Sequence, residues 1–236
     1  TVELSTWKIT DVRSSSFGLT LVWLEIRESD SLVSVEKANG QAIPSTAPAA
    51  DVLAILSGGT WTGQYDAPNS AKQASGLVVS NGAQVSAFTP ATTGGVLYAC
   101  KDDLLVVDAA AYAKKFANQK LPCTGASVLQ ASAILVRDGK PQQFPAGVKA
   151  NRMAIGQDED RVVIIGAFTS FGTALSLADF ANWIAAAAPK MKRNGLDAVN
   201  LDGGCSAQLS IPHLKRRFGC DTPGYNINRI VVRREP

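Results

Sequence analysis

The 236-residue sequence is poor in the residue types on which several common chemistries depend. It contains one histidine, His213, and its four cysteines form no Cys-x-x-Cys pair. These shortages exclude a two-histidine metal site and the usual zinc patterns. His213 would be the only base for a serine triad, but it follows Pro212 in a polar turn. We therefore interpret His213 as a structural or surface residue.

Other absences narrow the class of protein further. No Walker-type or Gly-x-Gly-x-x-Gly loop follows a predicted strand, which argues against a nucleotide-phosphate loop. No apolar run is long enough to cross a bilayer, so we expect no membrane span. The net charge of +3 is too small to indicate a nucleic-acid partner. With 46% hydrophobic and 18% charged residues, the composition is that of a globular protein with a large core.

The four cysteines allow three disulfide pairings. Sequential pairing, Cys100 with Cys123 and Cys205 with Cys220, closes two modest loops, and we predict these two bridges. Disulfides form in oxidising compartments, so the prediction implies a secreted or periplasmic protein. Four buried thiols in a cytosolic protein are the alternative.

Short apolar runs predominate along the chain and predict many strands. The clearest lie at residues 19–26, 32–35, 76–80, 104–107, 133–137, 161–167, 198–201, 207–211 and 227–232. Helices are predicted at 49–54, at 109–118, and from Ser176 onward, with Asp179 completing a capping box and Gly195 as the C-terminal cap. Many strands with few helices predict an α+β fold with a mixed, largely antiparallel β-sheet core, in one domain over residues 1–236.

The most informative segment is Asn200-Leu201-Asp202-Gly203-Gly204-Cys205-Ser206. An apolar strand leads into a carboxylate, two glycines and a serine, and strand ends commonly present chemistry to solvent. A shorter version occurs at Ser57-Gly58-Gly59-Thr60-Trp61 after another apolar run. Two such elements in one chain predict one site built from both. The simpler interpretation is that Asp202 only caps its own turn.

Five segments in order resemble the phosphodiester glycosidase family. The family's Asn-Leu-Asp-Gly-Gly-Gly-Ser segment is matched by residues 200–206, and its Arg-Thr-Ala-Ile-Gly segment by 152–156. A Leu-x-Arg-Asp-Gly strand end is matched at 135–139, and the Leu-Ser-Leu-Ala-Asp-Phe helix at 175–180. The family's Asn-Gly-Gly-Phe-Phe is represented at 57–61, with serine in place of asparagine. The resemblance covers residues 50–235.

The resemblance implies a hydrolase that cleaves a sugar 1-phosphodiester, with an N-acetylglucosamine-type sugar. It assigns Asp202 as the essential carboxylate, Arg152 as the cation that stabilises the phosphate, and Ser57 as a third catalytic residue. The remaining residues, expected to bind substrate, are Gly58, Gly59, Trp61, Asn200, Gly203, Gly204 and Ser206. Asp66 is a candidate second carboxylate. Cysteine replaces the family's third glycine at Cys205, which suggests that this position serves a bridge to Cys220.

Two other functions remain open from the sequence. Serine at position 57 and Cys205 are departures that a non-catalytic sugar or sugar-phosphate binding domain of a cell-envelope polysaccharide system would tolerate. The Gly-Gly turns could also belong to a scaffold without a site. We expect no resident cofactor, although Asp202, Asn200 and backbone carbonyls are oxygen ligands of the kind that a divalent cation such as calcium takes.

Overall fold

The computed structural model describes residues 7–14, 18–44, 49–62, 73–89, 94–101, 103–116, 123–222 and 224–235. For residues 7–14, 61–62 and 116 it describes the backbone alone.

The apolar runs form three main sheets and one short ladder. In spatial order, the seven-stranded sheet contains β1 (Trp7–Ser14), β2 (Leu19–Arg27), β15 (Arg161–Phe168), β14 (Arg152–Asp158), β16 (Asp197–Asn200), β12 (Ala133–Arg137) and β13 (Lys140–Pro141). One five-stranded sheet contains β10 (Asp103–Asp108), β9 (Gly95–Cys100), β11 (Ser127–Ala131), β7 (Val78–Ser80) and β8 (Ala83–Ser86). The other contains β18 (Arg216–Phe218), β17 (Leu209–Ile211), β4 (Val52–Ser57), β19 (Asn228–Arg234) and β3 (Ser31–Lys37). The short ladder pairs β5 (Trp61–Thr62) with β6 (Gln73–Ala74).

The strand pairings within the described ranges are all antiparallel. Two α-helices flank the sheets, α1 (Ala109–Phe116) and α2 (Leu177–Ala187). Four short 3-10 turns complete the description: η2 (Glu28–Asp30), η4 (Ala188–Met191), η5 (Gly204–Ser206) and η6 (Pro212–Leu214). The predicted α+β class with a largely antiparallel core is confirmed.

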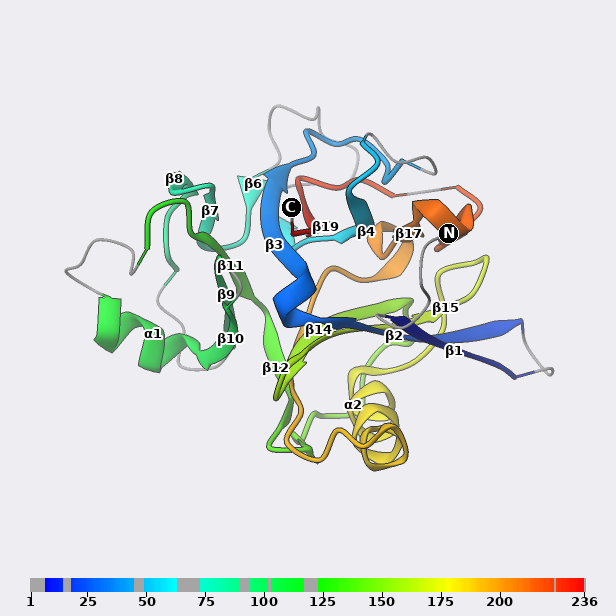
Figure 1. Cartoon of the computed structure of the whole chain (residues 1–236). Helices are drawn as coiled ribbons and strands as arrows, with labels where there is room; N and C mark the ends of the chain where they lie inside the picture. Colours follow the sequence, from blue (N-terminus) through cyan, green and yellow to red (C-terminus); the bar gives the residue numbers. More distant parts are fainter. Residues whose placement is uncertain are drawn as a thin grey trace.

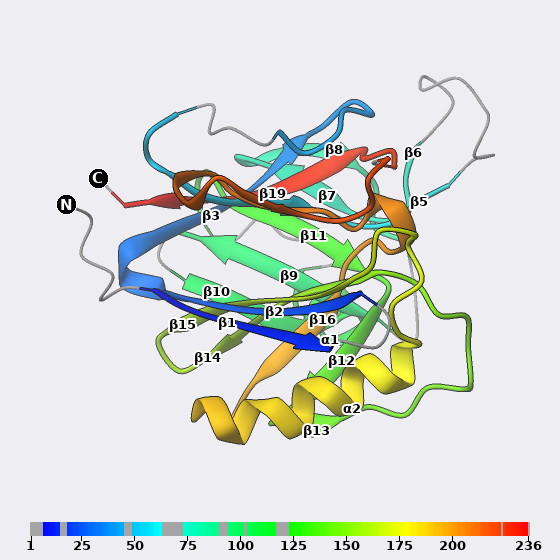
Figure 2. The same ribbon diagram turned by 90° about the vertical axis from the view of Figure 1, so that its right-hand side faces the viewer.

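The main hydrophobic core lies where the three sheets face one another (Figure 1). Leu24 of β2, Leu56 of β4 and Leu97 of β9 are almost completely buried in it. The helix α2 covers the opposite face of the seven-stranded sheet, as both views show (Figures 1 and 2). Its Phe180 and Ile184 are fully buried there. Both faces of the seven-stranded sheet are therefore covered, one by the main core and the other by α2.

Ser176 caps α2 as predicted, because its side chain accepts a hydrogen bond from the Asp179 N–H. The predicted cap at Gly195 is wrong. Lys192, with φ of 62°, ends the following 3-10 turn. Gly195 instead lies against Asp158, whose Oδ1 would be 2.9 Å from an added Cβ. The glycine is thus explained by close approach rather than by a helix end.

The predicted helix at 49–54 is also wrong. Residues 50–51 form a turn, and β4 begins at Val52. Every residue of β4 is buried, with β17 on one side and β19 on the other. Pairing with two neighbouring strands in the core overrides the local helix preference of this alanine-containing segment.

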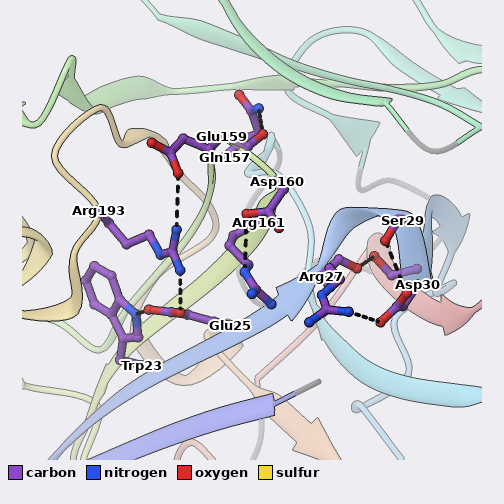
Figure 3. Close-up of polar contacts among 11 residues, drawn as sticks. Trp23, Glu25, Arg27, Ser29, Asp30, Gln157, Glu159, Asp160, Arg161 and Arg193 are labelled. Atoms are coloured by element: carbon purple, nitrogen blue, oxygen red, sulfur yellow. Dashed lines mark hydrogen bonds and ion pairs between the residues drawn. The ribbon is translucent and has the colours of Figure 1, made fainter. Parts of the chain in front are cut away.

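A buried ion pair attaches the segment that follows α2 to the seven-stranded sheet (Figure 3). Glu25 on β2, only 5% exposed, accepts hydrogen bonds from Trp23 Nε1 at 2.8 Å and from Arg193 Nη2 at 3.2 Å. Because Arg193 leads toward β16, this contact helps to set the path of the strand that ends at Asp202.

Candidate functional site

The segment around Asp202 is where three parts of the chain meet. Its strand β16 lies between β14 and β12, with Asn200 paired to Ala154. Past the strand end, the Asp202 N–H donates to the Gly58 carbonyl at 2.9 Å. The Gly204 N–H donates to the Asn151 carbonyl at 3.0 Å. The predicted Gly-Gly elements of β4 and β16 are therefore in direct contact, and the start of β14 adjoins them.

The Asp202 carboxyl is withdrawn from solvent at Oδ2, although the residue as a whole is half-buried. Burial raises its pKa to about 7, and hydrogen bonds from the Gly203 N–H and the Ser206 side chain oppose that shift only partly. Oδ1 accepts the Gly203 N–H at 2.8 Å, which is the turn-capping role that the simpler interpretation predicted. Oδ2 is buried and has no hydrogen-bond partner at ordinary geometry, although the Ser206 hydroxyl is near enough to favour the ionised form. One oxygen thus caps the turn, and the other lies near the Ser206 hydroxyl.

Arg152 is the first residue of β14 and lies beside the same turn. Its Nε donates to the Leu175 carbonyl at 3.0 Å, and its Nη2 donates to the Val148 carbonyl at 2.7 Å. Its Nη1 is 3.5 Å from the position that a Cβ of Gly203 would take. Burial lowers the pKa of the guanidinium.

No carboxylate in the described ranges forms an ion pair with Arg152. Asp202 does not do so either, so the two groups flank Gly203 without neutralising each other. A partly buried guanidinium held by two carbonyls, with no acid beside it, is the arrangement expected of an anion site.

The N–H groups of the four glycines that were predicted to bind substrate all donate within the chain. Gly58 donates to the Asn228 carbonyl at 3.1 Å, and Gly59 to Asn228 Oδ1 at 2.7 Å. The Gly203 N–H donates to the Asp202 carboxyl, and the Gly204 N–H donates to the Asn151 carbonyl. In this structure the glycines allow close packing, since a Cβ on Gly58 would lie 1.7 Å from Asn228 Oδ1.

Ser57 lies beneath the site and is fully buried. Its hydroxyl donates to the Ser206 carbonyl and accepts the Gln208 N–H at 2.7 Å. The structure therefore gives Ser57 the task of holding the segment that follows Asp202. Ser206 is itself 8% exposed and adjoins the carboxyl from the other side of the turn. A direct part for either serine in chemistry stays a prediction.

Three asparagines carry unsatisfied polar atoms around this turn. Asn200, Asn226 and Asn228 are 5%, 1% and 2% exposed. Asn200 Oδ1, Asn228 Nδ2 and both side-chain atoms of Asn226 are buried without a hydrogen-bond partner. Burying such atoms costs free energy unless water or a ligand forms hydrogen bonds with them. Asp202 Oδ2 is a further buried atom without a hydrogen-bond partner.

Asn226 and Asn228 were not predicted from the sequence. The available signal was Asn226-Ile227-Asn228, in which two amides alternate with an apolar residue at the start of the last strand. Alternation places both amides on one side of the extended chain. The hydrogen bond from Gly59 to Asn228 then brings that side to the Gly-Gly element.

The Cys205–Cys220 disulfide holds the turn in place. Both predicted pairings are present, with Cα–Cα distances of 6.2 Å for Cys100–Cys123 and 5.1 Å for Cys205–Cys220. Gly172 packs against the second bridge, and Asn151 Nδ2 lies 3.6 Å from the Cys220 sulfur. The bridge therefore ties η5, directly after Asp202, to the loop that precedes β19.

Two predicted residues have no side-chain description. Trp61 lies in β5, where the structure gives the backbone only, and Asp66 lies outside the described residues. The described part of the chain also holds no cluster of three or more acidic, histidine or cysteine side chains suited to a metal. Asn200 Oδ1 and Asp202 Oδ2 are the oxygens that a hard cation would take first.

With this geometry in place, the comparison with known families decides the assignment. The phosphodiester glycosidase family model matches residues 52–232, which include Gly58, Arg152, Asp202 and Asn228. The chain belongs to the phosphodiester glycosidase family. This membership supports a hydrolase that acts on sugar phosphodiesters, and it covers every segment that meets at the Asp202 turn. Among curated proteins, none matches the chain in sequence.

Solved structures share the fold at low sequence identity. The zebrafish N-acetylglucosamine-1-phosphodiester alpha-N-acetylglucosaminidase catalytic domain, auto-inhibited by its pro-peptide, has a TM-score of 0.65 and 17% identity. That match covers 98% of this chain and 82% of the zebrafish chain. A putative exported protein from Burkholderia pseudomallei K96243 has a TM-score of 0.61 and 13% identity, covering 92% of this chain and 74% of the other.

A hypothetical protein from Synechocystis has a TM-score of 0.57 and 14% identity, with 97% of this chain and 62% of the other covered. At these identities the three likenesses establish the fold alone. No helix within the described ranges of this family member is long and apolar enough to cross a membrane.

Proposed function

We propose that this phosphodiester glycosidase hydrolyses the bond between an N-acetylglucosamine-type sugar and the phosphate of a 1-phosphodiester. One observation carries the proposal. A buried carboxyl with a pKa of about 7 and an unpartnered oxygen lies across Gly203 from an arginine that no described carboxylate neutralises. The carboxyl suits proton transfer near neutral pH, and the arginine suits a phosphate.

In the proposed reaction, water attacks the anomeric carbon. The bond from that carbon to the phosphate oxygen breaks, its electron pair stays on the phosphate, and the water proton goes to Asp202. Phosphate is already a good leaving group, so one carboxylate can serve where most glycosidases need two. Arg152 stabilises the charge that develops on the departing phosphate.

The buried asparagines would supply sugar contacts. Asn200 Oδ1 and Asn228 Nδ2 offer one acceptor and one donor, the two kinds of group that a sugar hydroxyl can satisfy. Trp61 would stack on the sugar ring, while Ser57, Ser206 and the glycines would hold the cradle rigid.

The aglycone would leave past two exposed apolar side chains. Val148 and Phe171 are 83% and 86% exposed. Val148 accepts from Arg152 Nη2 through its carbonyl, and the neighbour of Phe171, Gly172, accepts from the Asn151 N–H at 2.8 Å. Both side chains therefore belong to segments that touch the proposed phosphate site.

The test measures hydrolysis of UDP-N-acetylglucosamine and of a nitrophenyl sugar phosphodiester. Asp202→Asn and Arg152→Met are expected to lower kcat/KM by about a hundredfold or more, as loss of an acid–base group or a charged contact does. Asp160→Asn, which alters an exposed turn carboxylate, is the matched control and should keep full activity. Full activity of Asp202→Asn would contradict the assignment of Asp202 as the essential carboxylate.

We also propose that turnover needs no resident metal. Activity that survives dialysis against EDTA supports this, whereas loss of activity that calcium restores would assign Asn200 Oδ1 and Asp202 Oδ2 to a cation instead. The two disulfides and the exported relative from Burkholderia pseudomallei support a secreted or periplasmic location. Fractionation of producing cells tests it.

A sugar-phosphate binding domain without turnover is the second candidate. It is favoured by Ser57, which replaces the family asparagine and whose hydroxyl is wholly engaged within the chain. Tight binding of N-acetylglucosamine 1-phosphate with no release of product from any diester would support this candidate over the enzyme.

A further inference from the structure

An open cavity lies where β3 ends and β19 begins, beside β6 and β8. Its volume is about 750 Å³, large enough for more than one sugar unit. Residues of β3, β6, β8 and the segment before β19 contribute to its wall. The lining residues used below are Lys37, Asn39, Gly76, Ser86, Thr89 and Tyr225.

The strand register connects this cavity to the proposed catalytic turn. In the sheet that holds β4, β19 and β3, Gly58 hydrogen-bonds to Asn228, and Asn228 is the register partner of Lys37. Neighbouring strands are about 4.8 Å apart, so the Lys37 backbone lies about 10 Å from Gly58. The Asp202 N–H in turn donates to the Gly58 carbonyl at 2.9 Å. Direct backbone hydrogen bonds and strand register therefore connect Asp202 through Gly58 and Asn228 to Lys37.

The short ladder of β5 and β6 makes a second connection. The Ser75 N–H donates to the Thr60 carbonyl at 2.9 Å, and Ala74 pairs with Trp61. Ala74 lines the cavity, while Thr60 directly follows Gly58 and Gly59. The Gly-Gly element is thus linked through Thr60 and Trp61 to a strand that lines the cavity.

The cavity wall is held by buried contacts. Gln130, 7% exposed, accepts the Leu77 and Thr89 N–H groups, both at 3.0 Å, and donates to the Thr89 carbonyl at 2.7 Å. The Ser86 hydroxyl donates to the Gly76 carbonyl. On the other wall, the Tyr225 ring packs on Gly40 so closely that a Cβ there would lie 2.0 Å from Cε2. These contacts describe a preformed pocket with an aromatic side.

Lys37 is the one charged residue among the described residues that line the pocket, and it forms no ion pair with a described acid. The described lining is therefore positively charged. Asn39, Ser86 and Thr89 add neutral hydrogen-bonding groups, as a polyhydroxylated ligand requires. An acidic sugar matches this combination of one cation, several polar groups and one aromatic ring.

We propose that this cavity is a subsite for an acidic sugar unit linked to the non-reducing side of the sugar whose phosphodiester is cleaved. The inference rests on the proposed function. Arg152 takes the phosphate, the scissile sugar lies over Asp202, and the chain beyond it continues past Asn228 to Lys37. The substrate is therefore an anionic oligosaccharide 1-phosphodiester, with a carboxylate, phosphate or sulfate on its second unit, rather than a single sugar.

The test compares two substrates. One is an N-acetylglucosamine 1-phosphodiester whose sugar is uncharged, called the neutral substrate below. The other carries glucuronic acid on the non-reducing side of the same sugar. For the wild-type protein, kcat/KM should be about tenfold higher for the acidic disaccharide, which is the effect of one partly exposed charged contact. Lys37→Met should abolish that preference without changing turnover of the neutral substrate, and Lys37→Glu should reverse it. Lys140→Met, at an exposed lysine on β13, is the matched control.

Two further outcomes separate the inference from the function. Equal kcat/KM for both substrates in the wild type, or an equal loss for both in Lys37→Met, overturns the subsite while leaving the hydrolase intact. If neither substrate is hydrolysed, calorimetric binding of the acidic disaccharide 1-phosphate decides. Weaker binding by Lys37→Met then supports the subsite and rejects only turnover, whereas unchanged binding rejects the subsite.

Discussion

At the scale of single residues, the environment of Asp202 sets both chemistry and stability. Its folded-state pKa of about 7 lies above the ordinary value of 3.8, so the folded protein binds a proton more tightly than the unfolded chain. The stabilising contribution of the protonated Asp202 carboxyl to the free energy of unfolding is therefore fully present below about pH 4. It is lost as the pH rises toward 7 and does not change further at higher pH. A site that needs a buried carboxyl thus lowers the stability of the protein at the pH where it would work.

Asp202→Asn is expected to stabilise the fold and remove activity together. Each unit of pKa shift corresponds to roughly 1.4 kcal/mol, so the gain at pH 8 should be on the order of a few kcal/mol. The melting temperature of the variant should exceed that of the wild type at pH 8, with the difference shrinking toward pH 4. A difference that is the same at both pH values would show that the Asp202 carboxyl is not perturbed by burial.

Gly58 is a second residue whose identity is fixed by contact. Because a Cβ would lie 1.7 Å from Asn228 Oδ1, Gly58→Ala must displace that amide and break its bond to the Gly59 N–H. We expect a loss of about 1–3 kcal/mol in unfolding free energy, typical of overpacking, together with a large drop in activity. Gly147→Ala, whose Cβ would meet only the Pro145 carbonyl at 3.7 Å, should change neither. Urea denaturation and hydrolysis assays measure both, and a Gly58→Ala protein with wild-type behaviour would contradict the packing.

At the scale of elements, the strands were the most predictable part of the fold. The continuous apolar run in β2 and the alternating burial in β3 both follow from their sequence patterns. The Asn81-Gly82 turn between β7 and β8, with φ of 49° and 81°, has the dipeptide typical of a two-residue hairpin. The segment at 49–54 was predicted wrongly, because its helix preference is weaker than the pairing that β17 and β19 offer to β4.

The two disulfides differ in the element that each one restrains. Cys205–Cys220 fixes η5 beside Asp202, whereas Cys100–Cys123 joins the end of β9 to the segment before β11. Removal of a native disulfide typically costs about 2–5 kcal/mol.

We therefore expect Cys205→Ser/Cys220→Ser to lose stability and most activity, since the turn loses its tether. Cys100→Ser/Cys123→Ser should lose stability while the folded fraction keeps its kcat. Thermal melts and assays on the folded fraction, below the melting temperature, measure both. Equal kcat for the two double variants would show that the bridge beside Asp202 does not position the turn.

At the scale of the whole molecule, three sheets share one core (Figure 1). The Glu25–Arg193 pair contributes to that arrangement from the opposite side of the seven-stranded sheet (Figure 3). Their side chains are only 7% and 13% exposed, so each charge depends on the other for compensation.

Arg193→Met is expected to destabilise the protein by about 3–5 kcal/mol, because it leaves Glu25 buried without its cation. The double variant Glu25→Leu/Arg193→Met should recover much of that loss, since no isolated charge remains. Chemical denaturation of the two variants gives the comparison. A double variant no more stable than Arg193→Met would show that packing, rather than the unpaired charge, causes the loss.

The sequence by itself determined the elements and the chemical groups of this protein. Periodic burial of apolar side chains predicts strands, and the order of short motifs assigns the family and its Asp202, because both depend on neighbours along the chain. Only the tertiary structure decided how those groups are used. It showed that the four glycine N–H groups donate within the chain, that Ser57 is buried beneath the turn, and that Asn228 accepts the Gly59 N–H while its amide nitrogen has no partner. These properties depend on contacts between residues far apart in the chain, such as Gly59 with Asn228, and no local pattern encodes them.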